Sequence, residues 1–473
     1  MNFSTKESKI NKGMLTVIPV TENLRNEILA EKLSDFSISS RVFSAKKDST
    51  LVFEREGKLL LLLGLGTDPE YKTIETSFRR VIAKNHELVE NSIHLDFYKT
   101  FDSAVVEAAV TGLMLGNYQL DFYKKERKKN FENLEIAVLS TAKNLENSLD
   151  RAQKIGKAKI EAFSLVDLPP NKVTPEFLAD WAASLARIPQ VNVTIYDQKM
   201  AKELGLEAFL AVSRGSAKPP KFIVIEYRHP QAKKHIGLVG KGVTFDTGGL
   251  NVKTQGMHYM KSDMGGAATV LAATQLIGEL GLPINLTTIV PSVENAIDKN
   301  AYLPSEVIGS HAGLSIEIVD TDAEGRLILA DGLSYLVKNY QVDTLLDFAT
   351  LTGSAVGTFG YESAALFSND EQLSQEIQKL GMLIDEKAWP LPIWDVYGKE
   401  MDSEIADIRN FHGKPIAGAI TAAKFLQAFI HEHPSWAHLD IAGVAFGDGE
   451  FSKSKSGTAY GVHLLLKFIE NQL

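Results

Sequence analysis

Residues 314–326 read LSIEIVDTDAEGR, an apolar, β-like run that ends in three acids and an arginine. A strand with this ending places its acids at the C-terminal edge of a sheet, where open α/β sheets bind ligands. Asp322 and Glu324 are two residues apart, so an extended chain projects both side chains to one side. Two carboxylates that close repel each other unless a proton or a cation lies between them. Taken alone, the stretch equally fits a polar turn with Asp322 as the N-cap of a helix.

Two further glycine-rich segments carry charged residues. Residues 236–249 read IGLVGKGVTFDTGG and place Lys241 and Asp246 behind another apolar run, and the next segment adds Lys253 and Asp263. With Asp322 and Glu324 of the first stretch, the set offers four carboxylates and no histidine or cysteine. Hard oxygen ligands of this kind suit Mn²⁺ and Mg²⁺, and also Zn²⁺. Four acids with a few cations are typical of a two-metal hydrolytic site, in which carboxylates hold ions roughly 3.5–4 Å apart.

Strand-like and helix-like runs alternate along the chain. In the first part we expect strands at 59–63, 92–97 and 134–139, and helices at 73–90 and 103–115. After a helical stretch at 145–165 and a helix start with Thr174 as N-cap before Pro175, we expect strands at 222–227, 236–244, 286–290, 316–320, 344–348 and 437–441, and helices at 265–280, 327–339 and 420–431. This alternation predicts a mostly parallel sheet with helices on both faces.

The predicted fold class is therefore α/β, with two domains. Residues 1–150 form a smaller N-terminal α/β domain, and residues 151–473 form a larger α/β domain whose mostly parallel central sheet carries the two-metal site. The polar groups at 241–246, 320–324 and 350–353 are expected to converge at one edge of that sheet.

Composition limits the classes of partner and compartment. The formal net charge of −9 argues against a nucleic-acid partner, and the basic run at 123–129 contains an acid, which is typical of a solvated loop. The absence of cysteine excludes disulfides and thiolate ligands and fits a reducing compartment. The first eight residues are polar, the apolar stretch at 14–20 is too short for a signal peptide, and no run reaches the roughly 20 residues that span a bilayer. We expect a soluble, cytoplasmic protein without a membrane partner.

The two glycine-rich and acidic segments resemble a known family. Residues 239–249 and 320–327 are similar to the hallmark segments of the leucyl (cytosol) aminopeptidases, V-G-K-G-x-T-F-D-[ST]-G-G and N-T-D-A-E-G-R-L. Shorter stretches agree, and the resemblance covers roughly residues 155–473; these stretches are 168–171, 174–176, 349–353 and 440–443. The resemblance implies a metal-dependent exopeptidase that hydrolyses the first bond of peptides with a free N-terminus, with leucine and other apolar residues preferred. It also implies a macrodomain-like N-terminal domain and a homohexamer.

The resemblance assigns roles by motif position. The ligands of two divalent ions (Mn²⁺ or Zn²⁺, with Mg²⁺ as a third candidate) would be Lys241, Asp246, Asp263, Asp322 and Glu324, and the ions would share Asp246 and Glu324. A lysine ligand must be neutral, so its pKa must fall far below about 10.4; burial and an adjacent dication both lower it. From the residues alone, Lys241 also fits a surface lysine in a glycine turn.

Two cations are left for catalysis. The resemblance makes Lys253 a stabiliser of the tetrahedral oxyanion and Arg326 the anchor of a bicarbonate ion that acts as general base. No motif side chain is an obvious general base, because every motif carboxylate except Asp320 is assigned to metal. The alternative for Arg326 is an ion pair with Asp320 or Glu324.

The pocket for the N-terminal side chain is also implied by position, at Met260, Thr350, Gly353, Ala442 and Ala445. Relatives often carry a larger residue where Ala445 stands, so we expect a roomier pocket that accepts bulky side chains. The chain departs from the pattern at three places: the loop between Lys253 and Asp263 is one residue shorter, His258 stands where an acid is frequent, and Asp320 replaces an asparagine. We expect Asp320 to accept backbone N–H groups rather than to bind metal.

The sequence is less consistent with other functions. A DNA-binding regulatory role, which some relatives have, requires clustered Lys and Arg, and a catalytically silent scaffold is disfavoured because every motif side chain is present. A P-loop, a His-Glu-x-x-His motif and a Gly-x-Ser-x-Gly elbow are absent from the sequence. The histidines His431, His433 and His438 are expected to face solvent rather than to bind a metal.

Overall fold

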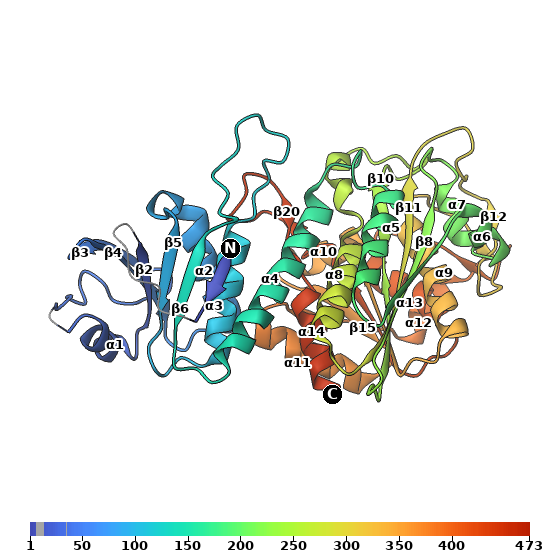
Figure 1. Cartoon of the computed structure of the whole chain (residues 1–473). Helices are drawn as coiled ribbons and strands as arrows, with labels where there is room; N and C mark the ends of the chain where they lie inside the picture. The colour runs from blue at the N-terminus through green and yellow to red at the C-terminus, as the bar shows by residue number, and fades with distance from the viewer. Residues whose placement is uncertain (6–13, 35) are drawn as a thin grey trace. The chain divides into compact units, whose positions relative to one another are not determined.

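The computed structural model of the chain describes residues 1–5, 14–34 and 36–473, so residues 6–8 of the polar N-terminus lie outside the described part. The chain divides into two compact units, Met1–Ile160 and Glu161–Leu473 (Figure 1). The division falls within helix α4 (Leu145–Asp167), which also contains the boundary expected at residue 150. In the part of the chain that the structure describes, no helix is long and apolar enough to cross a membrane.

The first unit is built on one six-stranded sheet with the strand order β1-β6-β5-β2-β4-β3. Its strands are β1 (Asn2–Ser4), β2 (Leu15–Thr21), β3 (Thr50–Arg55), β4 (Lys58–Gly66), β5 (Ser92–Asp96) and β6 (Glu135–Leu139). Only the β3–β4 pair is antiparallel. The helices of this unit besides α4 are α1 (Arg25–Lys32), α2 (Tyr71–Lys84) and α3 (Ser103–Gly116). Helix α2 ends earlier than the expected 73–90, and a 3₁₀ turn (His86–Leu88) follows it.

An ion pair is buried inside this unit. Glu75 of α2 accepts hydrogen bonds from Lys159 Nζ and Lys72 Nζ, both at 2.6 Å, and Glu75 and Lys159 are only 1% and 2% exposed. Burial raises the pKa of Glu75, but the charges of Lys159 and Lys72 outweigh burial and hold it well below its ordinary value. The carboxylate is therefore ionised and links α2 to α4.

The second unit contains a nine-stranded sheet with the order β16-β15-β18-β14-β9-β11-β8-β7, and β10 pairs with β11. Its strands are β7 (Val191–Tyr196), β8 (Lys221–Arg228), β9 (His235–Gly240), β10 (Gly242–Asp246), β11 (Asn285–Asn295), β14 (Thr344–Ala349), β15 (Ala364–Ser368), β16 (Ala388–Pro390) and β18 (Trp436–Asp440). The central strands β11, β9, β14 and β18 run parallel to one another, and antiparallel pairs occur only toward the flanks. The predicted mostly parallel α/β sheet is confirmed.

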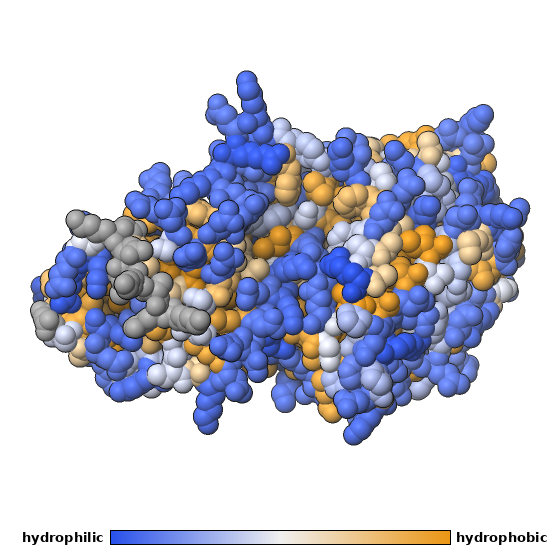
Figure 2. Space-filling view, in the orientation of Figure 1, coloured by the Kyte–Doolittle hydropathy of each residue, from blue (hydrophilic) through white to orange (hydrophobic). Residues whose placement is uncertain are grey.

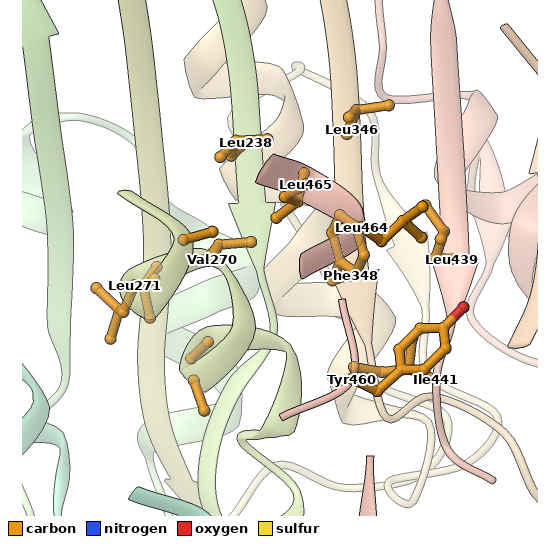
Figure 3. Packing of buried hydrophobic residues seen from close by; sticks show 14 of the residues in the cluster. Leu238, Val270, Leu271, Leu346, Phe348, Leu439, Ile441, Tyr460, Leu464 and Leu465 are labelled. Carbon is orange, nitrogen blue, oxygen red and sulfur yellow. The ribbon is translucent and has the colours of Figure 1, made fainter. Parts of the chain in front are cut away.

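Helices cover both faces of this sheet because its strands are apolar on both sides. In β9, Leu238 packs into one hydrophobic cluster and Val239 into another. Figure 3 shows the first cluster, where Leu238 and Leu346 from the strands face Leu465 of α14. The helices that supply the clusters are the end of α4, α5 (Pro175–Ala183), α6 (Gln198–Glu203), α7 (Glu207–Ser213), α8 (Gly265–Leu280), α9 (Glu324–Asn339), α11 (Glu371–Ile384), α13 (Gly418–Gln427) and α14 (Val462–Asn471). On the face in Figure 2, hydrophobic residues show only in separate groups between hydrophilic ones.

Two of the local predictions from the sequence, the N-cap of α5 and the bounds of α8, are correct, and a third, the strand at 236–244, is incomplete. Thr174 caps α5, since its Oγ1 accepts the N–H of Phe177 at 3.2 Å. Helix α8 has the expected bounds. The strand expected at 236–244 is divided into β9 and β10 at the single residue Lys241.

The strand expected at 316–320 was wrong. Only Ile316–Glu317 (β13) is extended, and it lies outside the large sheet, in a three-stranded sheet with β12 (Val307–Ile308) and β17 (Ile408–Arg409). The chain then turns, and Glu324 already begins α9. An alternating apolar pattern predicts that one face of a strand is buried, but it does not indicate which sheet buries that face. The pattern at 316–320 therefore could not show that this segment lies outside the large sheet.

Candidate active site

A pocket of about 890 Å³ lies where the central parallel strands end. The seven charged residues that the motifs singled out all line it: Lys241, Asp246, Lys253, Asp263, Asp322, Glu324 and Arg326. Lys241 follows β9, Thr350 follows β14 and Asp246 ends β10, so the carboxyl ends of parallel strands supply these groups. The other acids do not come from a strand of this sheet: Asp322 lies in the turn before α9, Glu324 is the first residue of α9, and Asp263 follows the 3₁₀ turn Met257–Ser262.

Lys241 occupies the break between β9 and β10. Its backbone N–H donates to the carbonyl of Phe348 at 3.0 Å, and its carbonyl accepts from Ala267 N at 2.9 Å. The lysine side chain passes close to a backbone that carries no side chains. A Cβ atom placed on Gly325 would lie 2.6 Å from Lys241 Nζ, and one on Gly266 would lie 1.9 Å from the carbonyl oxygen of Phe348.

The ammonium of Lys241 is held by three oxygen atoms. Nζ lies 2.9 Å from Asp263 Oδ1, 3.0 Å from Glu324 Oε1 and 2.8 Å from the carbonyl oxygen of Thr350. The residue is 3% exposed, so the alternative of a surface lysine is wrong. Burial lowers the pKa of Lys241, but Asp263, Glu324 and Asp246 outweigh burial and raise it above its ordinary value. The low pKa that a ligating lysine requires therefore depends on cations that neutralise these carboxylates.

Asp246, Asp322 and Glu324 come together around Lys253. One oxygen atom of each carboxylate lies within 4.8 Å of the others. Lys253 Nζ lies 2.8 Å from Asp246 Oδ2 and 2.5 Å from Asp322 Oδ1. Burial, together with Glu324 and Asp246, raises the pKa of Asp322 to about 7. The N-cap of α9 is Ala323 without a side-chain bond, so Asp322 is not the helix cap that the sequence allowed.

The acid cluster fits divalent cations. Asp263 Oδ2 and Glu324 Oε2 are buried and have no hydrogen-bond partner among the described residues. Burial, followed by the charge of Asp246, raises the pKa of Glu324, and burial also raises the pKa of Asp263. Buried carboxylate oxygens without partners require a proton or a cation. Since the donors are carboxylate oxygens and one amine, the residues suit Mn²⁺, Mg²⁺ or Zn²⁺.

Several polar residues that the sequence did not single out position these acids. Asn295, at the end of β11, donates to Asp246 Oδ1 at 2.8 Å and to the carbonyl of Thr321 at 3.1 Å. Thr321 Oγ1 donates to the carbonyl of Gly248 at 2.7 Å and accepts the N–H of Asn251 at 2.9 Å. These bonds join the turn before α9 to the loop behind β10. The sequence pattern predicted that this strand ends at residue 290, whereas β11 continues to Asn295. A correct prediction of the strand length would have placed Asn295 at the site.

Arg326 also lines the pocket and is buried. Its Nη1 donates to the carbonyl of Asn410 at 2.6 Å, whereas its Nε has no hydrogen-bond partner in the described part of the chain. Burial lowers the pKa of Arg326 to about 10, against the effect of Glu324 and Asp320. No ion pair joins Arg326 to Asp320 or Glu324 within the described residues, so the alternative role was wrong. Asp320 Oδ1 instead accepts the N–H of Asp322 at 2.8 Å, as expected.

The structure brings four of the five expected side-chain pocket residues to the same pocket. Met260, Thr350, Gly353 and Ala442 line it. Ala445 does not: it is buried, and its Cβ lies 3.1 Å from a Cβ placed on Gly265. The sequence did not single out several other lining residues, among them a group whose members contact one another: Tyr259, Tyr361, Phe446 and Lys455.

The structure gives the positions of two histidines that the sequence had singled out, His258 and His438. His258 does not line the pocket, and its ring lies 3.9 Å from the ring of Tyr259. His438 was expected to face solvent but is fully buried, with Nδ1 at 2.5 Å from Asp347 Oδ1. Burial lowers the pKa of His438, but Asp347 outweighs it and raises the pKa overall. The buried carboxylate of Asp347 therefore explains why this histidine lies inside the fold.

Comparisons with known proteins bear on the family and the fold of the chain. The family model described as "Cytosol aminopeptidase family, catalytic domain" matches residues 161–466. A probable cytosol aminopeptidase of Chlorobaculum tepidum is 42% identical over 374 residues, which are 76% of this chain and 74% of that protein. Among solved structures, a tomato leucine aminopeptidase variant has a TM-score of 0.88 at 30% identity, covering 100% of this chain and 96% of that one. The bottromycin maturation enzyme BotP in complex with Mn has a TM-score of 0.85 at 28% identity, covering 97% and 99%.

Proposed function

Since the chain belongs to the cytosol aminopeptidase family, we propose that its acid cluster hydrolyses the first bond of peptides with two divalent metal ions. Membership of the family makes the protein a hydrolase of the aminopeptidase class. The metals and the preference for leucine and other apolar N-terminal residues belong to the proposal. The observation that carries it is the approach of Asp246, Asp322 and Glu324 to within 4.8 Å, in a pocket that Lys253 and Arg326 also line.

The residues that would hold the metal ions are Lys241, Asp246, Asp263, Asp322 and Glu324, and Asp246 and Glu324 would contribute to both sites. Mn²⁺ is our first candidate because the similar BotP structure is described with Mn; Zn²⁺ and Mg²⁺ suit the same donors. When bound, such ions activate a water molecule and polarise the scissile carbonyl. The unpartnered oxygens of Asp263 and Glu324 support this assignment.

The chain's own residues supply the remaining functions. Lys253 carries a cation at the acid cluster and would stabilise the oxyanion that develops on the scissile carbonyl. Arg326 would anchor a bicarbonate ion as general base, and its unpartnered Nε supports a bound anion. Met260, Thr350, Gly353 and Ala442 would hold the N-terminal side chain. A cytoplasmic homohexamer remains our proposal for the assembly and its location.

Removal of the metal tests the proposed function. After exhaustive chelation, hydrolysis of leucine amide should fall at least about 100-fold, because the activated water and the polarised carbonyl are lost together. Addition of Mn²⁺ should restore it. Metal content measured by mass spectrometry before and after chelation gives a second readout. Full activity in metal-free protein would contradict the proposal.

The size of the pocket predicts the tolerance for bulky residues. We expect kcat/KM for phenylalanine amide to lie within about 10-fold of that for leucine amide, because the pocket of about 890 Å³ has room for the three additional side-chain carbons of phenylalanine. A pocket that fits only leucine would give a larger difference, since a misfit of a single methylene already costs about 1–3 kcal/mol, or roughly 10–200-fold. Hydrolysis of both amides is measured under the same conditions. N-acetyl-leucine amide is the control and should not be hydrolysed, because its amine is blocked. A strong loss on phenylalanine amide would show that the pocket is narrow.

A further inference from the structure

Lys455 brings a cation into the pocket from outside the acid cluster. It directly precedes β20 (Ser456–Gly457), which pairs with β19 (Phe446–Gly447) in a short antiparallel hairpin. The hairpin places both Phe446 and Lys455 in the pocket lining. Lys455 forms no ion pair within 4.0 Å in the described part of the chain.

Two aromatic rings hold the ammonium of Lys455. Nζ lies 3.1 Å from Tyr361 Oη, 4.9 Å from the centroid of the Tyr361 ring and 5.2 Å from the centroid of the Tyr259 ring. Cation–π contacts of this kind orient a lysine without neutralising it. An ammonium has three N–H donors, and the hydroxyl of Tyr361 accepts one of them. The other two are available to a ligand.

The other lysines of the lining already face carboxylates. Lys241 and Lys253 pair with the acid cluster, and Lys414 pairs with Glu400. Asp448 is the acid that acts on Lys455, and it is exposed and beyond ion-pair distance. Lys455 is thus a lining lysine whose charge no carboxylate of the described residues neutralises within 4.0 Å.

The position of Lys455 points to one part of the substrate. Tyr259 precedes Met260, a residue proposed to hold the N-terminal side chain, and its ring lies 5.9 Å from the ring of Phe446. Ala442, which also lines the pocket, precedes the same hairpin in the chain. The side chain of the N-terminal residue would therefore extend toward Tyr259, Tyr361 and Lys455.

We propose that Lys455, with Tyr259 and Tyr361, forms a subsite for a carboxylate on the side chain of the N-terminal residue. Peptides that begin with glutamate or aspartate are then substrates beside those that begin with apolar residues. The inference rests on the proposed function, because it uses the same pocket and the same substrate orientation. The carboxylate would accept the two remaining N–H groups of Lys455, and charge-assisted hydrogen bonds of this kind are short and strong.

The test compares Lys455→Met with the wild-type protein and with Lys453→Met. Methionine keeps the length of the side chain and removes its charge. Lys453 is an exposed lysine of the same hairpin and is not part of the pocket lining, so its replacement controls for net charge. For each Mn²⁺-loaded protein, kcat/KM is measured on glutamate, glutamine and leucine p-nitroanilides. Calorimetric titration with free glutamate and free glutamine, which have no scissile bond after the first residue, gives a binding readout that does not require turnover.

In Lys455→Met, the ratio of kcat/KM for glutamate to that for leucine should fall about 10–100-fold, the range expected for charge-assisted hydrogen bonds. The glutamate-to-glutamine ratio of binding constants should fall in parallel, and Lys453→Met should keep both wild-type ratios. Unchanged ratios in Lys455→Met would overturn the subsite. A loss that appears on leucylglycine but not on its amide would overturn it too, because Lys455 would then bind the peptide's C-terminal carboxylate.

The same measurements separate the two proposals. If the wild-type protein hydrolyses the leucine substrate and the ratios do not change, only the subsite is wrong. If no anilide is hydrolysed, the proposed function fails, and the calorimetric comparison of glutamate with glutamine still decides whether Lys455 binds a side-chain carboxylate.

Discussion

Asp322→Ala should lower kcat/KM for leucine amide by at least about 10³-fold and should leave the fold intact. The loss follows because Asp322 contributes to the three-carboxylate group that suits metal, and metal stabilisation of transition-state charge is worth several kcal/mol. The fold should survive because the side chain is partly exposed and its ion pair with Lys253 is of a kind worth about 0–1 kcal/mol. Bound metal per chain, measured by mass spectrometry, should fall with the activity.

Asp320→Ala is the matched control for this substitution. Asp320 lies two residues away and also lines the pocket, but its carboxylate accepts the N–H of Asp322 instead of joining the acid cluster. We expect a loss of less than about 10-fold, equivalent to one hydrogen bond of about 1 kcal/mol. Near-wild-type activity of Asp322→Ala, or equal losses for both variants, would contradict the ligand assignment.

Glu75→Gln should destabilise the first unit by about 3–5 kcal/mol, the cost of leaving one charge of a buried ion pair without its partner. The cause is Lys159, which is 2% exposed and loses the carboxylate at 2.6 Å. All four tryptophans lie after residue 160, so tryptophan fluorescence reports on the second unit. Hydrogen exchange of peptides from α2 should therefore accelerate in urea at concentrations where the tryptophan signal is still native.

The pH dependence gives the sign of the effect. The pKa of Glu75 is lower in the folded chain than its ordinary value, so its contribution is fully present above about pH 5 and disappears as the pH falls through the folded pKa. The difference in the free energy of unfolding between Glu75→Gln and wild type should shrink below about pH 4.

Lys72→Met is the matched control, because Lys72 is partly exposed and its replacement should cost about 0–1 kcal/mol of stability. A double variant with Glu75→Leu and Lys159→Met should recover most of the loss.

The sequence predicted the site better than its surroundings. The hallmark segments identified the family and contain most of the charged residues of the pocket, namely Lys241, Asp246, Asp322, Glu324 and Arg326. Lys253 and Asp263 lie outside these two segments, shortly after the first of them. The α/β class and the mostly parallel sheet followed from alternation alone. The assignment of the first unit as macrodomain-like stays a prediction.

Contacts between residues that are far apart in the chain could not be predicted from the sequence. Asn410 holds the turn before α9 by accepting the N–H of Val319 at 2.8 Å across 91 positions, and no local pattern marks such an amide. Lys159 and Glu75 are 84 positions apart, and no local pattern marks their ion pair either. Ala445 was assigned to the pocket by motif position, whereas the packing against Gly265 decides where its methyl group lies.

The glycines around Lys241 have a consequence for how the site can vary. Gly325 and Gly266 leave no space for a single methyl group, and Gly240 would bring one within 2.7 Å of the carbonyl oxygen of Gly266. Lys241 is thus located as much by missing side chains as by the carboxylates around it. Alanine, the smallest change that mutation can make at these positions, should be as damaging there as the loss of a charge. The spectrum of tolerated variants would then outline the site through residues that perform no chemistry.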